Sequence, residues 1–251
     1  MNKELNKIIT TPPKICIVLG SGLDSLVDSI QNKKILPYDN IKGFMKTSVS
    51  GHIGQFIFGY LDKVPVLCAL GRFHYYEGYT FEEVGIIVKI FSVYKPEAII
   101  ITNSSGCLRL NWEIGSFMLI NKIIDFSFID TNIPKTYKIK SNLKLNTSIR
   151  LGTYAYTIGP TYETEAEINE IARLGGDAVG MSTLPEYLMC KKLGINPIII
   201  SCLTNYGAGL IKKKVLHKDV LKNAKKVKLK FIYLIRAIIQ SIELQKKQKI
   251  Q

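Results

Sequence analysis

Short apolar runs alternate with amphipathic stretches along this chain. Residues 15–19 and 197–203 are continuous apolar runs. Runs of this length are typical of strands buried on both faces of a sheet. Residues 56–60 and 64–70 predict two paired strands around Asp62-Lys63. Shorter apolar runs predict further strands at residues 98–101, 117–120 and 178–181.

Helical patterns separate the predicted strands. Residues 81–94 carry apolar side chains at helical spacing. Thr164 and Glu167 form a capping box, which predicts a helix that starts there and stops at Gly175-Gly176. Further helices are expected over residues 23–30, after Ser182-Thr183 with Pro185 in the first turn, and over residues 220–242, where one apolar stripe runs along a long helix.

This alternation predicts an α/β fold. We expect a single domain over residues 1–251, with a mixed central β-sheet flanked by helices on both faces. The polar stretch from Ser127 to Gly152 is the one candidate long loop, and nothing in it indicates a domain boundary.

Composition excludes several classes of partner. The formal net charge is +14, but the excess is almost all lysine and is spread along the chain, so we interpret it as a solvated surface and expect no nucleic-acid partner. No stretch approaches the roughly 20 apolar residues of a membrane helix, and the polar N-terminus lacks a signal-peptide core. The five cysteines show no paired spacing, which indicates free thiols in a cytoplasmic protein. Three histidines and scattered cysteines give no metal-site spacing.

A glycine loop and a basic pair indicate an oxyanion site. Gly20-Ser21-Gly22 follows the apolar run 15–19 directly, so backbone N–H groups there can point at an anion. Arg72 can hold an anion bidentately, and His74 can add a donor. Glu77 lies in the same short segment. Together these residues predict chemistry on or with phosphate.

Polar residues also follow the other predicted strands, at 103–105, 163, 181–182 and 204–205. Loops at strand ends converge in α/β sheets, so we expect these residues to share one site. The motifs together closely resemble those of the trimeric purine nucleoside phosphorylases. The resemblance rests on Val18–Leu23, Gly51–Gly54, Gly71–Tyr79, Thr102–Gly106, Gly159–Thr164, Val179–Glu186, and Thr204-Asn205 followed by His217.

The resemblance implies an activity and a set of roles. The enzyme would use inorganic phosphate, with no cofactor or metal, to cleave inosine and guanosine or their deoxy forms into base and (deoxy)ribose 1-phosphate, in purine salvage. It would be a homotrimer. Phosphate would be bound by Ser21, His52, Arg72, His74, Ser182 and the backbone N–H of Ser104; ribose by Tyr76, Met181 and His217; purine by Tyr162, Glu163 and Asn205; and His74, Glu163 and Asn205 would be catalytic.

Elementary chemistry supports the purine roles. Negative charge grows on the departing base, and Asn205 can donate near N7 and O6. Glu163 can accept from N1–H. A 6-oxopurine carries that proton, whereas the unprotonated N1 of a 6-aminopurine would face the carboxylate as an acceptor.

Simpler interpretations stay open for individual residues. Ser21 could only cap the following helix, His74 could be structural, and Glu163 could only favour the N-terminus of the helix at Thr164. His217 could be a surface histidine.

The chain also departs from the family pattern. Ser104 and Ser105 stand where two alanines are usual, and the segment 126–154 is short. It lacks a match to the phenylalanine that relatives insert into a neighbouring subunit, although Phe126, Phe128 or Tyr137 could substitute. Two alternative functions therefore remain: methylthioadenosine phosphorolysis, which Asn205 in place of an aspartate disfavours, and weak nucleoside binding without efficient catalysis.

Overall fold

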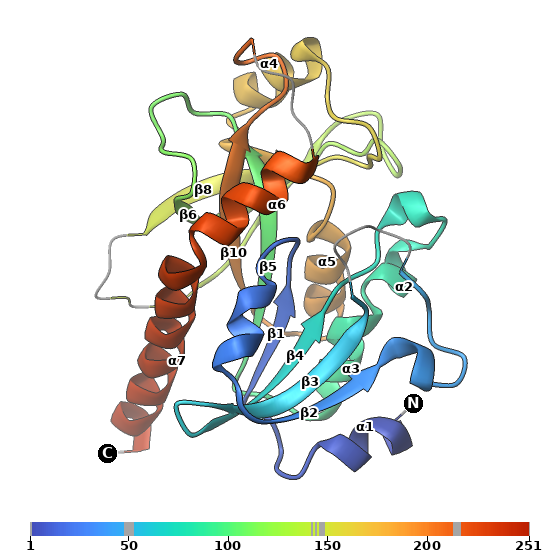
Figure 1. Cartoon of the computed structure of the whole chain (residues 1–251). Coiled ribbons are helices and arrows are strands. Elements are labelled where there is room, and N and C mark those ends of the chain that lie inside the picture. The colour runs from blue at the N-terminus through green and yellow to red at the C-terminus, as the bar shows by residue number, and fades with distance from the viewer. Residues whose placement is uncertain are drawn as a thin grey trace.

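The computed structural model describes residues 2–47, 53–141, 143, 145, 149–212 and 217–250 (Figure 1). For residues 2, 217, 218, 249 and 250 it describes the backbone alone. Its strands form a mixed sheet in the order β10-β6-β8-β9-β5-β1-β4-β3-β2, with β7 paired to β6. The strands are β1 (Ile15–Leu19), β2 (Gln31–Pro37), β3 (Gln55–Leu61), β4 (Val64–Leu70), β5 (Ala98–Cys107), β6 (Phe117–Asp125), β7 (Lys135–Lys138), β8 (Arg150–Tyr156), β9 (Ala178–Gly180) and β10 (Ile198–Tyr206).

The sheet mixes two kinds of pairing: β2–β3, β3–β4, β5–β9, β6–β7 and β6–β10 are antiparallel, and the other pairs are parallel. Strand β1 runs parallel to β4 and β5, and β5 runs parallel to β10. Strands β3 and β4 form the expected hairpin, with Asp62 and Lys63 at φ of 49° and 69° in its turn. Because β10 pairs with both β5 and β6, the strands β5, β9, β8, β6 and β10 close into a ring.

Helices cover both faces of this sheet, which confirms the expected fold class (Figure 1). Ile87 of α3 and Leu184 of α5 are buried on one face, whereas Leu26 of η1 and Phe231 of α7 are buried on the other. The helices are α1 (Asn2–Ile8), α2 (Phe81–Val84), α3 (Ile86–Val93), α4 (Glu165–Arg173), α5 (Leu184–Lys192), α6 (His217–Lys226) and α7 (Lys228–Ile250), with 3₁₀ turns η1 (Asp24–Ser29), η2 (Tyr38–Asn40) and η3 (Tyr75–Glu77). No helix in the described part of the chain is both long and apolar enough to cross a membrane.

Several predicted elements differ in the structure. The helix expected over 81–94 is divided at Gly85, where an added Cβ would lie 2.8 Å from Cβ of Met189 on α5. This close packing between helices needs a residue without a side chain. The C-terminal stripe is likewise divided between α6 and α7, and residues 23–30 contain a 3₁₀ turn rather than an α-helix.

Three strands were not predicted: β8, which begins at the end of the stretch expected to be a loop, and the two strands β2 and β7. Strand β2 has one buried residue, Leu36, so it lacks both an apolar run and a clean alternation. Strand β7 lies inside the stretch expected to be a loop and pairs with β6. Edge strands that are mostly exposed leave little pattern for a periodicity argument.

A close backbone approach joins the ends of β1 and β5. A Cβ on Gly20 would lie 2.7 Å from Cα of Asn103 and 2.9 Å from the carbonyl oxygen of Thr102. The Thr102 hydroxyl accepts from the Gly20 N–H at 3.1 Å and donates to the Val18 carbonyl at 2.9 Å. Only glycine therefore allows the loop after β1 to lie against β5.

Candidate active site

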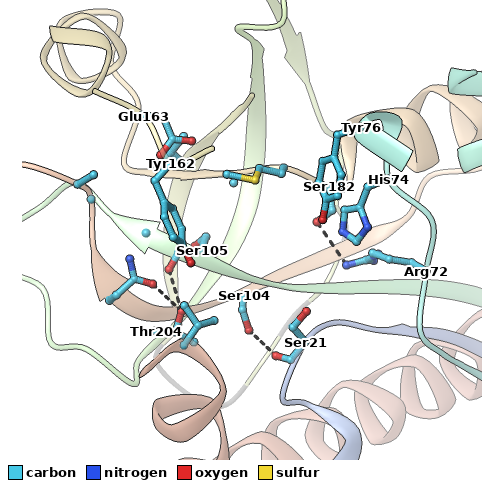
Figure 2. A pocket seen from close by; sticks show the side chains of 18 residues that line it. Ser21, Arg72, His74, Tyr76, Ser104, Ser105, Tyr162, Glu163, Ser182 and Thr204 are labelled. Atoms are coloured by element: carbon cyan, nitrogen blue, oxygen red, sulfur yellow. Dashed lines mark hydrogen bonds between the residues drawn. The ribbon is translucent and has the colours of Figure 1, made fainter. Parts of the chain in front are cut away.

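One pocket lies at the carboxyl ends of β1, β4, β5 and β10 (Figure 2). Every predicted site residue with a described side chain lines it: Ser21, Arg72, His74, Tyr76, Ser104, Tyr162, Glu163, Met181, Ser182 and Asn205. His52 lies outside the described residues, and only the backbone of His217 is described, at the start of α6. The strand ends thus converge as the sequence predicts, and they bring the described site residues to one pocket.

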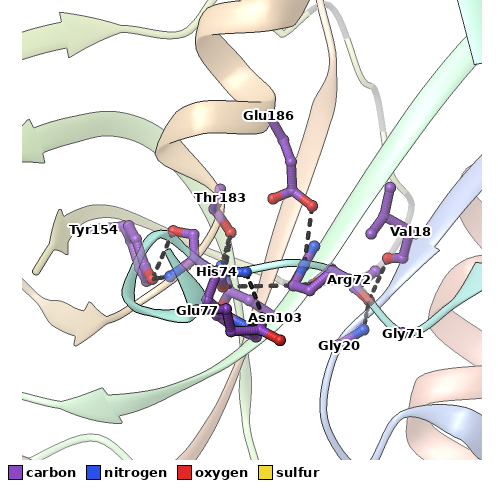
Figure 3. A network of polar contacts seen from close by, with 12 residues as sticks. Val18, Gly20, Gly71, Arg72, His74, Glu77, Asn103, Tyr154, Thr183 and Glu186 are labelled. Atoms are coloured by element: carbon purple, nitrogen blue, oxygen red, sulfur yellow. Dashed lines mark hydrogen bonds and ion pairs between the residues drawn. The ribbon is translucent and has the colours of Figure 1, made fainter. Parts of the chain in front are cut away.

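Arg72 follows β4 and is 2% exposed. Its Nε donates to Glu186 Oε1 at 2.9 Å (Figure 3). Its Nη1 donates to the Thr102 carbonyl at 2.6 Å and to Ser182 Oγ at 3.4 Å. A buried guanidinium needs these partners because desolvation penalises an unpaired charge heavily. The side chain is therefore held from two sides at one end of the pocket.

His74 is oriented by Glu77. The Glu77 Oε1 atom accepts from the His74 backbone N–H at 2.8 Å and lies 3.2 Å from Nδ1. A carboxylate facing Nδ1 favours the tautomer with its proton there and fixes the orientation of the ring. The imidazole also stacks on Tyr76, with centroids 4.8 Å apart and planes 16° apart. Burial, with Glu77 and Tyr162 adding to it, raises the pKa of Tyr76 to about 12, so this phenol stays neutral and can donate.

The backbone of Ser182 is clamped by Tyr154. The Tyr154 hydroxyl donates to the Ser182 carbonyl at 3.1 Å and lies 3.4 Å from its amide nitrogen. The next residue, Thr183, has φ of 82° and is fully buried. A β-branched residue rarely adopts this conformation, and such strain persists only where the surroundings impose it. Thr183 precedes α5 as expected, but its side chain makes no capping hydrogen bond.

Thr183 instead belongs to a buried chain of polar side chains. Asn103 Nδ2 donates to Thr183 Oγ1 at 2.8 Å, and Ser201 Oγ donates to Asn103 Oδ1 at 2.6 Å. Since Ser201 has already donated its proton, it accepts from Ser105, 2.6 Å away. The hydrogen bonds therefore all donate in one direction, from Ser105 toward Thr183. This chain links the loop beside Ser182 to the middle of the pocket.

Ser104 ties two strand ends together. Its hydroxyl donates to the Ser21 carbonyl at 2.7 Å (Figure 2). An alanine at this position could not make this bond, so the serine adds a tether between the loop after β1 and strand β5.

Glu163 lies in the loop before α4, at the other end of the pocket (Figure 2). Thr157 Oγ1 donates to its Oε1 at 2.7 Å. Burial raises the pKa of the Glu163 carboxyl, while the bond from Thr157 opposes that rise. The predicted capping box between Thr164 and Glu167 begins α4 directly afterwards. Helix α4 thereby fixes the loop that carries the carboxylate.

Asn205 is held by its two neighbours. Its Oδ1 accepts from Thr204 Oγ1 at 3.0 Å, and its Nδ2 donates to the Tyr206 carbonyl at 2.8 Å. An amide nitrogen has two protons, so one remains for a ligand. Tyr162, with 39% of its surface exposed, also lines the pocket and presents an aromatic ring to it.

Sequence reasoning missed the partners that orient the site. It gave Glu186 and Thr157 no role, although Glu186 ends one of the quoted motifs. Glu186 is 1% exposed, and a glutamate this buried needs a cationic partner. Its position three residues after Thr183 is the signal that could have found it. Groups of three or more potential metal ligands are absent from the residues that the structure describes.

Comparisons with known proteins identify relatives of the chain. The model of the Phosphorylase superfamily matches residues 14–240. Purine nucleoside phosphorylase 1 of Geobacillus stearothermophilus is 34% identical over 259 residues, covering 95% of this chain and 94% of the relative. The enzyme of the same name from Bacillus subtilis is 35% identical, covering 92% and 93%. A Schistosoma mansoni purine nucleoside phosphorylase solved with inosine superposes with a TM-score of 0.80 at 26% identity, covering 94% of this chain and 93% of that one.

Proposed function

The chain belongs to the purine nucleoside phosphorylases of the phosphorylase superfamily, and from this premise we propose its substrates and the roles of its residues. It cleaves 6-oxopurine ribonucleosides and deoxyribonucleosides with inorganic phosphate, giving free base and (deoxy)ribose 1-phosphate. The observation that carries this proposal is the two-ended pocket. Buried basic and hydroxyl donors lie at one end, and a carboxylate and an amide at the other.

At the phosphate end, directed donors hold the nucleophile. Arg72, His74 and Ser182 converge on one side of the pocket (Figure 2). Phosphate held there lies against the sugar, where it stabilises the developing oxocarbenium charge and attacks the anomeric carbon. Ser21 and the Ser104 backbone complete the cradle.

At the purine end, the site accommodates the negative charge of the leaving base. Glu163 accepts from N1–H, and the remaining Asn205 proton is donated toward N7 and O6. Tyr162 covers the base. The C6 oxygen and protonated N1 of inosine and guanosine match this pair. Adenine presents the opposite pattern and is a poorer fit, although a related Schistosoma enzyme was solved with adenosine.

The reaction is expected to need inorganic phosphate and no metal. Hypoxanthine release from inosine should stop in phosphate-free buffer, return with added phosphate, and be unaffected by a chelator, because the donor set contains no metal-ligand cluster among the described residues. A coupled absorbance assay measures this directly. Release at full rate without phosphate would identify a hydrolase instead, and no release under any condition would favour a binding protein.

The acid limb of activity should depend on Thr157. Burial raises the pKa of Glu163, so the ionised form that accepts N1–H is lost at a higher pH than for an exposed glutamate. Thr157→Val removes a donor to the carboxylate and should raise its pKa further. The acid limb of kcat/KM for inosine then moves to higher pH, while Thr157→Ser leaves it in place. An unmoved limb in the valine variant would contradict this assignment.

We also propose a homotrimer in which an aromatic residue covers the neighbouring sugar. Of the three candidates, Tyr137 packs edge-on against Tyr187 in its own subunit, with centroids 5.8 Å apart. Phe126 packs against the core. Phe128 packs edge-on against Phe126, with centroids 4.8 Å apart, but keeps 46% of its surface exposed. Phe128 is therefore the best candidate.

Phe128→Ala is expected to raise the inosine KM about tenfold and to change kcat little, because a cover binds substrate and transition state similarly. Steady-state kinetics measures this, and Tyr137→Ala is the matched control. Light scattering should give a trimer. A monomer, or an inosine KM that neither Phe126→Ala nor Phe128→Ala changes, would contradict the proposal.

The proposed setting is the cytoplasm, with small molecules as the ligands and no nucleic-acid or membrane partner. The buried free cysteines support a reducing compartment. Methylthioadenosine cleavage remains the alternative activity. The amide at Asn205 supports the 6-oxopurine assignment against it.

A further inference from the structure

A buried ion pair stands behind the phosphate end of the pocket. Arg72 and Glu186 have side-chain exposures of 2% and 1%, and their N–O distance is 2.9 Å (Figure 3). We propose that Glu186 is a positioning residue, which fixes the orientation of the Arg72 guanidinium for phosphate without touching phosphate itself. This inference rests on the proposed use of phosphate by this site.

The two edges of the Arg72 guanidinium have different partners. Its Nε faces Glu186 Oε1 at 2.9 Å. Its Nη1 faces Ser182 Oγ at 3.4 Å and the Thr102 carbonyl at 2.6 Å. Nε and Nη2 form one edge of the planar group, so Glu186 holds that edge and turns Nη1 toward Ser182. Ser182 lines the pocket, and its 3.4 Å contact with Nη1 is the longer of the two, so a bound anion can replace Ser182 as the acceptor of that Nη1 proton.

The atoms left over agree with this division. Among the described residues, Arg72 Nη2 and Glu186 Oε2 are buried without a hydrogen-bond partner. Nη2 lies on the same guanidinium edge as Nε, and Oε2 belongs to the same carboxylate as Oε1. Nε and Oε1 already share a hydrogen bond. The pair thus forms one of the two hydrogen bonds of a bidentate arginine–carboxylate contact. Nη2 and Oε2 are the atoms that could form the second. A side chain that rotated away would also leave Arg72 Nε and Glu186 Oε1 without each other, and unpaired buried polar groups are costly.

Glu186 is itself fixed by the start of α5. It lies in the first turn of the helix, where the helix dipole favours a carboxylate. The residue before this turn, Thr183, is anchored to β5, because its hydroxyl accepts from Asn103 Nδ2 at 2.8 Å. The orientation of Arg72 is therefore set by strand β5 and helix α5 together.

The pair also has no net charge. A phosphate beside Arg72 meets a guanidinium whose charge Glu186 balances, so directed N–H groups attract it more than net charge does. Binding should then depend on the reach of residue 186, and much less on its charge. That distinguishes positioning from simple neutralisation of a buried arginine.

The test compares two conservative variants of the full-length protein. Glu186→Asp keeps the charge and shortens the reach by one methylene, whereas Glu186→Gln keeps the reach and an oxygen acceptor but removes the charge. Calorimetric titration with inorganic phosphate gives Kd without turnover, and steady-state kinetics gives KM for phosphate and for inosine separately. Glu186→Ala is added for comparison if it folds.

Glu186→Asp should raise the phosphate Kd and KM about tenfold or more, because one misdirected charge-assisted hydrogen bond is worth about that factor. Glu186→Gln should stay within about threefold of wild type, and the inosine KM should change less than about twofold in both variants. Glu83 is the matched control, because it also lies in the first turn of a helix but is exposed and bonded to Thr80. Its Asp and Gln variants should leave phosphate affinity unchanged.

Three results would overturn the inference: an unchanged phosphate Kd in Glu186→Asp, a Glu186→Gln defect larger than that of Glu186→Asp, or equal increases in both KM values. The last would mark a general structural role. Failure of the proposed function is recognised separately, because wild-type protein would then show no phosphate-dependent cleavage whatever the titrations give.

Discussion

Glu163→Ala and Asn205→Ala are each expected to lower kcat/KM for inosine by about 100-fold or more. Both residues line the end of the pocket that we propose for the purine, and each substitution removes a group proposed to stabilise the departing base. The fold should survive, because Glu163 bonds mainly to Thr157 and Asn205 only to its own neighbours. Steady-state phosphorolysis measures the loss, and circular dichroism checks the fold.

Glu165→Ala provides the matched control for the carboxylate. Glu165 lies two residues after Glu163, at the exposed start of α4, and does not line the pocket. Its variant should keep near-wild-type kinetics. Wild-type rates in Glu163→Ala or Asn205→Ala would show that the purine lies elsewhere.

Gly20→Ala is expected to destabilise the protein by roughly 1–3 kcal/mol and to abolish measurable phosphate binding. The new Cβ would overlap Cα of Asn103 and the Thr102 carbonyl, both backbone atoms that cannot turn aside. Moving the loop after β1 away from β5 would break the bond between Ser104 and the Ser21 carbonyl. Thermal or urea unfolding measures the stability, and titration with phosphate measures the site.

Gly43→Ala separates this overlap from backbone strain. Gly43 has φ of 73° and no atom within 4 Å of an added Cβ, so its variant should lose only about 1 kcal/mol from conformation. Its phosphate affinity should equal that of wild type. If both alanine variants behave alike, the contact between β1 and β5 is not what makes Gly20 necessary.

Secondary structure was predictable where an element is buried on one face or on all sides, because burial leaves a pattern of apolar residues in the sequence. The apolar run 15–19 is β1, buried at every position, and the capping box at Thr164 begins α4 as expected. Elements defined by tertiary packing were not. The break at Gly85 depends on how closely Met189 approaches, which no local pattern records. Strand β2 failed for the opposite reason, because its residues are mostly exposed.

The candidate site followed the same division. Residues that follow strands, such as Ser21 and Arg72, were predictable because parallel strand ends converge. Their orienting partners were not, since Glu186 reaches Arg72 from a helix more than a hundred residues later in the chain. Thr157 is six residues from Glu163, yet only the path of the loop brings the hydroxyl to the carboxylate. Motifs predict which groups gather, and packing decides how each is aimed.

The closed ring formed by β5, β9, β8, β6 and β10 reduces the number of strand edges through which molecules could aggregate. Closing a sheet removes unpaired strand edges, which otherwise recruit other chains into aggregates. Among the described strands, β2 and β7 remain at the margins, each paired on one side only. Lys33 and Lys34 lie on β2, and Lys135 and Lys138 lie on β7. Positive charges repel a second copy of the same edge, so these four lysines can keep the open strand edges of separate molecules apart.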